Sequence, residues 1–141
     1  TIFAHELGHY RFAHIRKGIV VGTISTFLGL FLTAWLFDKS LTVFGFESRT
    51  DLAAIPLLAI GISLFSLFTS PIGNMISRKH EREADAYAVQ HTGRREAFAS
   101  ALRKLAGMNL ADPEPHPMVE FLFYSHPSIG KRIRALEQPE P

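Results

Sequence analysis

The stretch that decides the fold is residues 18–37, GIVVGTISTFLGLFLTAWLF, which contains no charged side chain. A helix of these twenty residues is about 30 Å long, which matches the hydrocarbon thickness of a bilayer. Residues 52–76 form a second uncharged stretch of twenty-five residues, long enough to cross a bilayer at a tilt. Neither stretch alternates with the period of two that marks a half-buried strand. The sequence therefore predicts an all-α, helical integral membrane protein in which two transmembrane helices form a hairpin.

Basic residues flank the two stretches on one side of the predicted hairpin. They are Arg11, Arg16 and Lys17 before the first stretch and Arg78, Lys79 and Arg82 after the second. The connecting residues 38–51 hold only two basic side chains, Lys39 and Arg49. Because an excess of Lys and Arg marks the cytoplasmic side of a membrane, we expect residues 1–17 and 77–141 to meet on that side.

Near the start of the chain, His5-Glu6-Leu7-Gly8-His9 forms the motif H-E-x-x-H. On a helix, positions i and i+4 differ by about 40° around the axis, so both imidazoles can reach one metal ion while Glu6 lies beside them. Neutral imidazoles suit zinc, and a catalytic zinc ion takes three protein ligands and leaves a fourth position for water. The motif therefore predicts half of a zinc site, with His5 and His9 as ligands and a third ligand elsewhere.

The residues directly after the motif do not supply that third ligand. A metzincin would need Gly at position 12 and His at position 15, where this chain has Phe12 and Ile15. On a continuous zinc helix over residues 1–17, His14 lies about 140° around the axis from His9, so we expect it to be a surface or interfacial histidine.

The third ligand is expected in residues 77–88, SRKHEREADAYA, which predict a helix that runs to about residue 91 and stops at Gly93. Glu81 and Asp85 are one turn apart on the same face. A carboxylate ligand followed by a second carboxylate supplies a metal bond and an acceptor for the outer N–H of a ligating histidine. We therefore predict Glu81 as the ligand and Asp85 as that acceptor, with Glu83 turned about 160° away toward solvent.

Two further segments are expected to have a structural role. Residues 94–106 have apolar positions at helical spacing and predict a helix that ends at Gly107. A proline-rich turn at residues 112–117 then leads to an apolar run at 118–124.

Residues 125–136, SHPSIGKRIRAL, contain a second group of candidate site residues. Pro127 fits the first position of a helix. The buried stripe of that helix would be Ile129, Ile133 and Leu136. Near a zinc ion, His126 and Arg132 could donate hydrogen bonds to the oxyanion of a tetrahedral intermediate or to a substrate carboxylate. The residues alone also allow both to be structural.

Taken together, the motifs H-E-L-G-H, S-R-x-x-E-x-x-A-D-x-x-A and S-H-P-x-x-x-x-R-I, with two spans between the first two, resemble the integral-membrane CAAX prenyl endopeptidase family of zinc metalloproteases over nearly the whole chain. The resemblance implies an all-helical membrane protein that encloses a chamber and binds one zinc ion per chain. It implies roles for the matching positions: His5, His9 and Glu81 on zinc, Glu6 as catalytic base, Asp85 as the second carboxylate, and His126 and Arg132 at the substrate or the oxyanion. HtpX-type quality-control proteases share the zinc residues and a paired-span insertion. Tyr10 stands where the prenyl proteases commonly have Trp, which bears on the subfamily and not on the chemistry.

The expected function of residues 1–141 is therefore that of a catalytic peptidase region in a multi-pass membrane protein. Zinc activates water and polarises the scissile carbonyl, while Glu6 takes the water proton and delivers it to the leaving amine. The expected partners are membrane lipids and a peptide or protein substrate, either a CAAX-type C-terminus that carries a lipid or another membrane-associated peptide. The alternatives are an HtpX-like protease and a non-catalytic scaffold. A haem-binding bundle is disfavoured because neither span contains a histidine.

Composition excludes other classes. The chain has 47% hydrophobic and 20% charged residues and a net charge of +2, which suits a membrane protein. We expect no nucleic-acid partner, because no basic cluster in the polar regions is interleaved with aromatic residues. The absence of cysteine rules out disulfides and thiolate ligands. Since the chain opens with Thr1 directly before the zinc motif, we expect it to be a fragment that has lost an apolar segment upstream.

Overall fold

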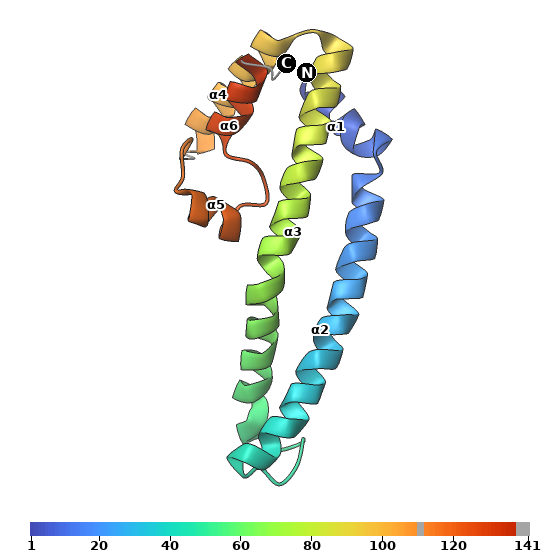
Figure 1. Cartoon of the computed structure of the whole chain (residues 1–141), viewed down its shortest axis with the longest axis vertical. Helices are drawn as coiled ribbons and strands as arrows, with labels where there is room; N and C mark the ends of the chain where they lie inside the picture. The colour runs from blue at the N-terminus through green and yellow to red at the C-terminus, as the bar shows by residue number, and fades with distance from the viewer. Residues whose placement is uncertain (110–111, 138–141) are drawn as a thin grey trace. The chain divides into compact units, whose positions relative to one another are not determined.

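The computed structural model describes residues 1–109 and 112–137, and every regular element in these ranges is a helix (Figure 1). In chain order the elements are α1 (Ile2–Arg11), α2 (His14–Phe44), a short 3₁₀ helix η1 (Leu52–Ala54), α3 (Ile55–Thr92), α4 (Arg95–Asn109), α5 (Pro117–Phe123) and α6 (Ile129–Glu137). The chain divides into two compact units. We call Lys17–Ser70 the hairpin unit, and Thr1–Arg16 together with Pro71–Pro141 the site unit.

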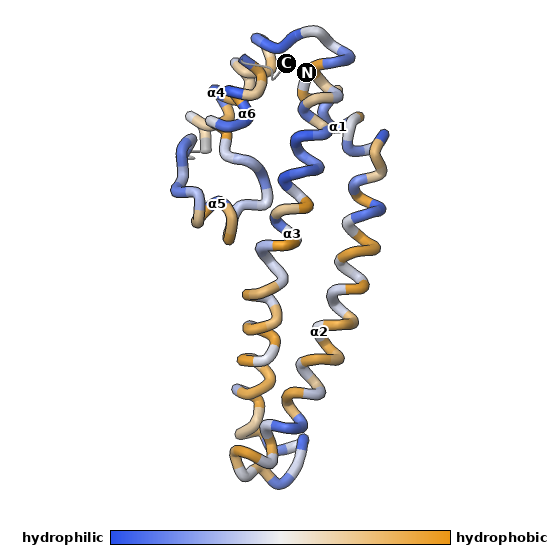
Figure 2. The backbone as a smooth tube through the Cα atoms, viewed as in Figure 1, coloured by the Kyte–Doolittle hydropathy of each residue, from blue (hydrophilic) through white to orange (hydrophobic). Residues whose placement is uncertain are grey.

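The hairpin unit contains the apolar parts of α2 and α3, which are orange along most of their length in Figure 2. Small residues lie where these two helices approach each other. A Cβ atom on Gly29 would lie 2.5 Å from Cε1 of Phe65, and one on Gly61 would lie 3.0 Å from Cγ2 of Thr33. Small residues that permit close backbone approach are typical of helix packing in membranes.

Most apolar side chains of the hairpin unit are exposed. Only 11% of the most apolar window of α2 and 6% of that of α3 are buried within the chain. A core helix of a water-soluble protein would be mostly buried, because exposed apolar surface costs about 25 cal/mol per Å² in water. Both helices are long and apolar enough to cross a membrane, as the two uncharged stretches predict.

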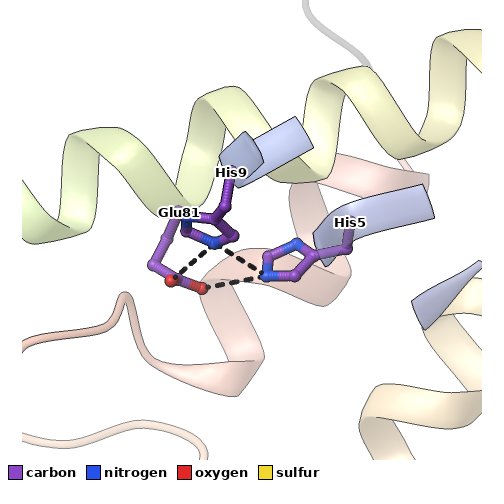
Figure 3. A group of neighbouring side chains, drawn as sticks. All are labelled: His5, His9 and Glu81. Carbon is purple, nitrogen blue, oxygen red and sulfur yellow. Dashed lines mark hydrogen bonds and ion pairs between the residues drawn. The ribbon is translucent and has the colours of Figure 1, made fainter. Parts of the chain in front are cut away.

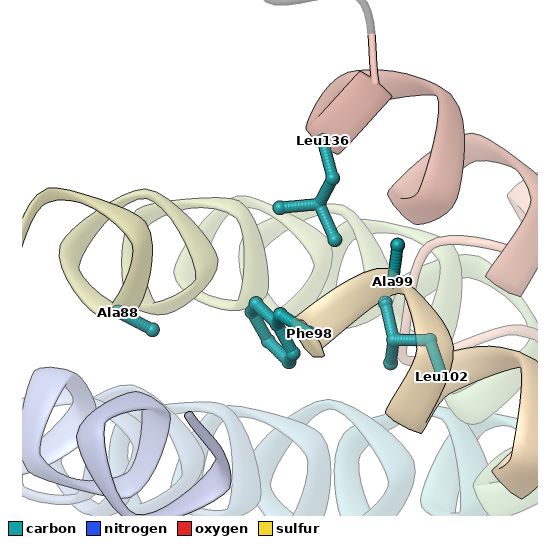
Figure 4. Close-up of a cluster of buried hydrophobic side chains, with 5 residues drawn as sticks. All are labelled: Ala88, Phe98, Ala99, Leu102 and Leu136. Carbon is teal, nitrogen blue, oxygen red and sulfur yellow. The ribbon is translucent and has the colours of Figure 1, made fainter. Parts of the chain in front are cut away.

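The site unit has a compact apolar core. It is formed by Ala88 of α3, Phe98, Ala99 and Leu102 of α4, and Leu136 of α6 (Figure 4). Side chains packed against it include Ala4 of α1 and the predicted stripe residues Ile129 and Ile133. This core therefore joins four helices, and the predicted stripe of α6 packs into it, with Leu136 buried and Ile129 and Ile133 partly buried.

One face of α3 is buried within the site unit, and half of the buried side chains are charged. The buried residues are Pro71, Arg78, Glu81, Ala84, Asp85 and Ala88. Most follow one another at intervals of three or four, so they lie along one face of the helix. Charged side chains are rarely buried unless they are paired, which marks this face as the location of a site.

Helix α1 crosses this face of α3 at very close range. A Cβ atom on Gly8 would lie 3.0 Å from Cα of Ala84 and 3.2 Å from Cβ of Tyr87. Because nearly all real Cβ contacts are longer, a larger residue at position 8 would push the two backbones apart. Gly8, between the two histidines of the motif, thus permits them to come close to α3.

Three predicted helix boundaries are wrong. The zinc helix does not continue to residue 17: α1 ends at Arg11, and Ala13 has a φ of 54° before α2 begins. A left-handed residue ends a helix, but alanine gives no sequence signal for one. Helix α4 continues past Gly107, and α6 begins at Ile129, two residues after Pro127. The predicted stop at Gly93, with a φ of 63°, is confirmed.

Candidate metal centre

Helices α1 and α3 place three donor side chains around a common point (Figure 3). The Nε2 atoms of His5 and His9 lie 3.2 Å apart. Oε1 of Glu81 is 3.2 Å from Nε2 of His9, and its Oε2 is 3.5 Å from Nε2 of His5. The side chains of His5 and Glu81 are almost fully buried. The structure thus brings together the three residues predicted as metal ligands.

These separations fit the donor atoms of one tetrahedral ion. The ligand–ligand distance in a tetrahedron is about 1.6 times the metal–ligand bond, so zinc bonds of about 2.0–2.2 Å give about 3.3–3.6 Å. Two imidazoles and one carboxylate are also the donor set of known catalytic zinc sites. The cluster of His5, His9 and Glu81 could therefore hold a metal ion.

The outer nitrogen of His5 faces Asp85. Its Nδ1 lies 2.8 Å from Oδ1 of Asp85, although the N–H is not aligned well enough for a regular hydrogen bond. Arg132 donates from Nε to Oδ2 at 2.8 Å and from Nη2 to Oδ1 at 2.7 Å. Burial alone would raise the pKa of Asp85, but its contacts with His5 and Arg132 outweigh burial and hold that pKa below its usual value. The predicted placement of Asp85 behind a ligating histidine matches this geometry.

Arg132 contacts both carboxylates of the candidate site. Its guanidinium makes a two-point contact with Asp85, and Nη1 lies 3.6 Å from Oε2 of Glu81. Only 10% of the side chain is exposed. Arg132 is therefore placed to hold Asp85, and through it His5.

His126 and Glu6 are exposed side chains near the cluster. The His126 side chain is 59% exposed, with Nε2 at 3.4 Å from Oε1 of Glu81 and Nδ1 at 2.9 Å from the Ser125 hydroxyl. Glu6 is exposed on α1 beside His5. Both side chains are therefore accessible to solvent.

The His9 ring is kept in the form that can bind a metal. Burial lowers the pKa of His9, and the negative charges of Glu81 and Glu6 offset only part of that effect. A neutral imidazole has a free lone pair on one nitrogen, which is what a metal ion requires.

Two buried charged residues to which the sequence analysis gave no role in the site, Arg78 and Glu120, hold the segment that carries His126. Arg78 Nη1 donates to the backbone carbonyls of Glu120, at 3.0 Å, and Tyr124, at the end of α5. The Glu120 carboxylate accepts the backbone N–H of Ser128 at 3.1 Å and the ammonium group of Lys131 at 2.6 Å. The buried position of Arg78 could have been predicted, because its spacing places it on the same face of α3 as Glu81 and Asp85. The buried position of Glu120 could not, because the apolar run around it contains no pattern that indicates a role for a carboxylate.

Two other residues differ in part from expectation. His14, expected to be a surface or interfacial histidine, is 4% exposed, so it does not lie at the surface. The break at Ala13 turns it back so that its Nδ1 lies 3.1 Å from Nδ1 of His9. Glu83, expected to face solvent, is 37% exposed, and it also accepts a 2.9 Å hydrogen bond from Nε2 of His14. Burial alone would raise the pKa of Glu83, but the hydrogen bond from His14 together with the nearby charges of Lys79, His14 and His80 outweighs burial and lowers that pKa.

The fold and the site together define a class: helical proteins with the His-Glu-x-x-His metal centre of metallopeptidases, in which the third donor comes from a separate helix. Within that class the chain belongs to peptidase family M48, which it matches over residues 1–140.

Known relatives agree with this assignment. The chain is 34% identical to the uncharacterized metalloprotease YhfN of Bacillus subtilis, over 99% of this chain and 34% of that protein. It is also 34% identical to the human CAAX prenyl protease 1 homolog, over 97% of this chain and 30% of that protein. The crystal structure of Ste24p from S. mikatae superposes with a TM-score of 0.78 at 26% identity, over 96% of this chain and 35% of that one. The resemblance to CAAX prenyl proteases is thus confirmed, together with the all-α membrane fold, and the chain spans about a third of the length of these relatives.

Proposed function

We propose that this chain forms the catalytic centre of a membrane-embedded zinc endopeptidase, with zinc bound by His5, His9 and Glu81. The observation that supports the proposal most strongly is the set of donor separations, 3.2, 3.2 and 3.5 Å, in a buried two-imidazole, one-carboxylate cluster. The alternative of a non-catalytic scaffold would require neither the exposed Glu6 nor the exposed His126 beside the cluster.

A zinc ion bound by these donors would polarise the scissile carbonyl group and make water acidic enough to be deprotonated near neutral pH. Glu6 accepts a proton from the attacking water as the new C–O bond forms. It then returns that proton to the leaving amine as the C–N bond breaks, so the carboxylate is regenerated. Because Glu6 is exposed next to His5, it can exchange this proton without moving a buried group.

His126 is proposed to stabilise the negative charge that develops on the carbonyl oxygen. Its ring lies at the edge of the donor cluster and is more than half exposed, so a bound peptide can receive a hydrogen bond from Nε2. Loss of one such donor typically lowers kcat by about 10²–10³-fold. Arg132 is proposed to act through Asp85, since its guanidinium is already engaged there.

The proposed substrates are peptides at a membrane. The human relative is named a CAAX prenyl protease 1 homolog, which favours peptides with a prenylated C-terminus over other membrane-associated peptides. The catalytic side is proposed to be cytoplasmic, because Arg11, Arg16 and Lys17 precede the first apolar stretch and residues 38–51 carry only two basic side chains. An HtpX-type quality-control protease would use the same centre on unlipidated substrates.

The proposal is tested with the full-length protein and its Glu6→Gln variant. We expect wild type to cleave a prenylated CAAX peptide and to incorporate one oxygen atom from labelled water into the new carboxyl group. Glu6→Gln should retain one zinc ion per chain and lose about 10²–10⁴-fold in turnover, because a general base and not a ligand is removed. Glu47→Gln, an exposed carboxylate in the hairpin unit, is the matched control and should behave as wild type.

Three results would count against the proposal. Turnover by Glu6→Gln at the wild-type rate would remove Glu6 as the base. Loss of zinc from that variant would contradict the assignment of ligands. Cleavage of only the unlipidated form of the same peptide would favour the quality-control alternative.

A further inference from the structure

The two histidines of the motif each point one nitrogen at the metal centre and the other away from it. For His5 the outer atom, Nδ1, faces Asp85, which Arg132 holds. For His9 the outer atom is also Nδ1, and it lies 3.1 Å from Nδ1 of His14. The mechanism above gives no role to His14 or to its own partner, Glu83.

His14 is fixed in place by its surroundings. It is 4% exposed, and its ring stacks on that of His80 at 4.1 Å between centroids and on that of Phe12 at 5.6 Å. On a continuous helix, position 14 would lie about 140° around the axis from position 9. The left-handed conformation of Ala13, with a φ of 54°, interrupts the helix and accompanies the return of His14 to His9.

The protons on His9 and His14 can be assigned so that each hydrogen bond from His9 to His14 and from His14 to Glu83 has one donor and one acceptor. When Nε2 of His9 binds a metal ion, the proton of the neutral ring must be on Nδ1. That N–H can donate only if Nδ1 of His14 is unprotonated, which puts the His14 proton on Nε2. Nε2 of His14 is the atom that lies 2.9 Å from Oε2 of Glu83, a carboxylate that can only accept. Each donor in the series therefore meets an acceptor.

A second metal ion at His14, His80 and Glu83 is a competing explanation, because one donor atom from each lies close to the others. The two rings, however, stack within 10° of parallel. An imidazole lone pair lies in the plane of its ring, so two stacked, parallel rings do not direct their lone pairs at one ion. Both nitrogens of His14 also already face partners, in His9 and Glu83.

We infer that His14 and Glu83 are a positioning pair for the metal ligand His9, an imidazole–carboxylate relay that fixes its tautomer and ring orientation. It is the counterpart, on the second histidine of the motif, of the Asp85–Arg132 pair behind the first. The inference rests on the proposed metal centre and adds two residues to it. Groups that accept a hydrogen bond from a ligating histidine typically contribute about 10–100-fold to metal affinity.

The test measures zinc affinity by competition with a chelator, and the visible spectrum of the cobalt-substituted protein, in full-length wild type and three variants. His14→Phe keeps an aromatic ring for the stacks with Phe12 and His80 and removes both hydrogen bonds. His14→Asn keeps a polar atom near the position of Nδ1 and loses the reach to Glu83. Glu83→Gln keeps the shape of an acceptor and removes its charge. His91→Phe, the same change at an exposed histidine of α3, is the matched control.

We expect zinc affinity to fall about 10–100-fold in His14→Phe, with an altered cobalt spectrum, and to fall less in His14→Asn and Glu83→Gln. The control should match wild type, and wild type should bind one ion per chain. Should His14→Phe fail to fold, reduced affinity in His14→Asn and Glu83→Gln supports the relay, and unchanged affinity in both overturns it.

Other outcomes separate this inference from the proposed function. Tight zinc binding by wild type with unchanged affinity and spectrum in all three variants would overturn the relay and leave the metal centre intact. Two ions bound per wild-type chain, with one lost in His14→Phe, would replace the relay by a second metal site. Absence of zinc from wild type would overturn the metal centre and the relay together.

Discussion

The site unit and the hairpin unit bury different kinds of side chains. Near the metal centre, buried positions include charged residues such as Arg78, Glu81 and Asp85, and each of these has an identified polar partner. In the hairpin unit, Gly29 and Gly61 lie where α2 and α3 approach closely, and most apolar side chains are exposed.

This difference predicts in which unit single substitutions should have large effects. A buried charge is stable only with a partner at the right distance and angle, so the site unit depends on individual atoms. A contact made by small residues, or a side chain that faces lipid, depends mainly on volume and apolar character. We therefore expect sharp effects of single changes in the site unit and weak ones in the hairpin unit.

The largest effect is expected from removal of a metal donor. His5→Ala, His9→Ala and Glu81→Ala should each abolish stoichiometric zinc binding and turnover, because two protein donors hold zinc poorly. Leu36→Ala, at an exposed apolar position of α2, should bind one zinc ion per chain. Metal analysis of the purified proteins checks both. Tight zinc binding by any of the three donor variants would show that the residue is not a ligand.

A change of volume at the crossing of α1 and α3 should have the next largest effect. Gly8→Val must displace α1 from Ala84 and thereby separate the motif histidines from Glu81. Misplacement by about 1 Å can lower catalysis by about 10²-fold, which is the decrease in kcat/KM that we expect. Gly73→Val, at a glycine of α3 with open space around it, is the control and should stay within about twofold of wild type. Equal activities would show that the close crossing is dispensable.

Substitutions of Arg132 distinguish two roles for its side chain: holding Asp85 and binding the substrate carboxylate. If it holds Asp85, Arg132→Ala should weaken zinc binding by about 10–100-fold, and Arg132→Lys should restore little because an ammonium group cannot make the two-point contact. If it binds the substrate carboxylate instead, zinc affinity should be unchanged and KM should rise. Zinc competition and steady-state kinetics on both variants decide between these outcomes.

The smallest effect is expected at Glu120, away from the donors. Burial alone would raise the pKa of Glu120, but hydrogen bonds from Lys131 and the Ser128 backbone, together with the charges of Lys131 and Arg78, outweigh burial and lower that pKa. Because the folded-state pKa lies below the usual value of 4.5, the ionised carboxylate stabilises the fold above that pH. This stabilisation is lost as the pH falls through the lower folded-state pKa.

Glu120→Gln should therefore lower the melting temperature at pH 7, by an amount that corresponds to about 1 kcal/mol, and the difference from wild type should shrink below pH 4.5. Thermal unfolding in detergent at both pH values measures it. A difference that grows on acidification would contradict the assigned direction of the pKa change.

Much of the fold was predictable from the sequence because its signals are local and strong. Two uncharged stretches predict α2 and α3 by length alone, and H-E-x-x-H fixes two donors on one turn of helix. The roles of Glu81 and Asp85 could be predicted because the two residues lie one turn apart on the same helix face. Gly93 marked a helix end because its backbone is left-handed, as glycine permits.

The features that could not be predicted depend on tertiary contacts. Ala13 adopts a left-handed conformation that its residue type does not favour, and the burial of His14 follows from the break at that position. The engagement of Arg132 by Asp85 cannot be derived from spacing, since the two residues are 47 positions apart. At Gly107 the sequence predicted a helix end where the helix continues. A glycine within a helix costs only about 1 kcal/mol, and tertiary packing can compensate for that cost.

X-ray absorption at the zinc edge of the full-length Glu6→Gln protein tests the metal centre most directly, because this variant keeps the ligands and does not turn over substrate. We predict one zinc ion per chain, with two imidazole nitrogens at about 2.0–2.1 Å and carboxylate or water oxygens at about 2.0–2.2 Å. In Glu6→Gln combined with Glu81→Ala, that ion should be lost. A zinc ion with fewer than two imidazole ligands, or one that survives the loss of Glu81 with an unchanged spectrum, would contradict the assignment of His5, His9 and Glu81 as its ligands.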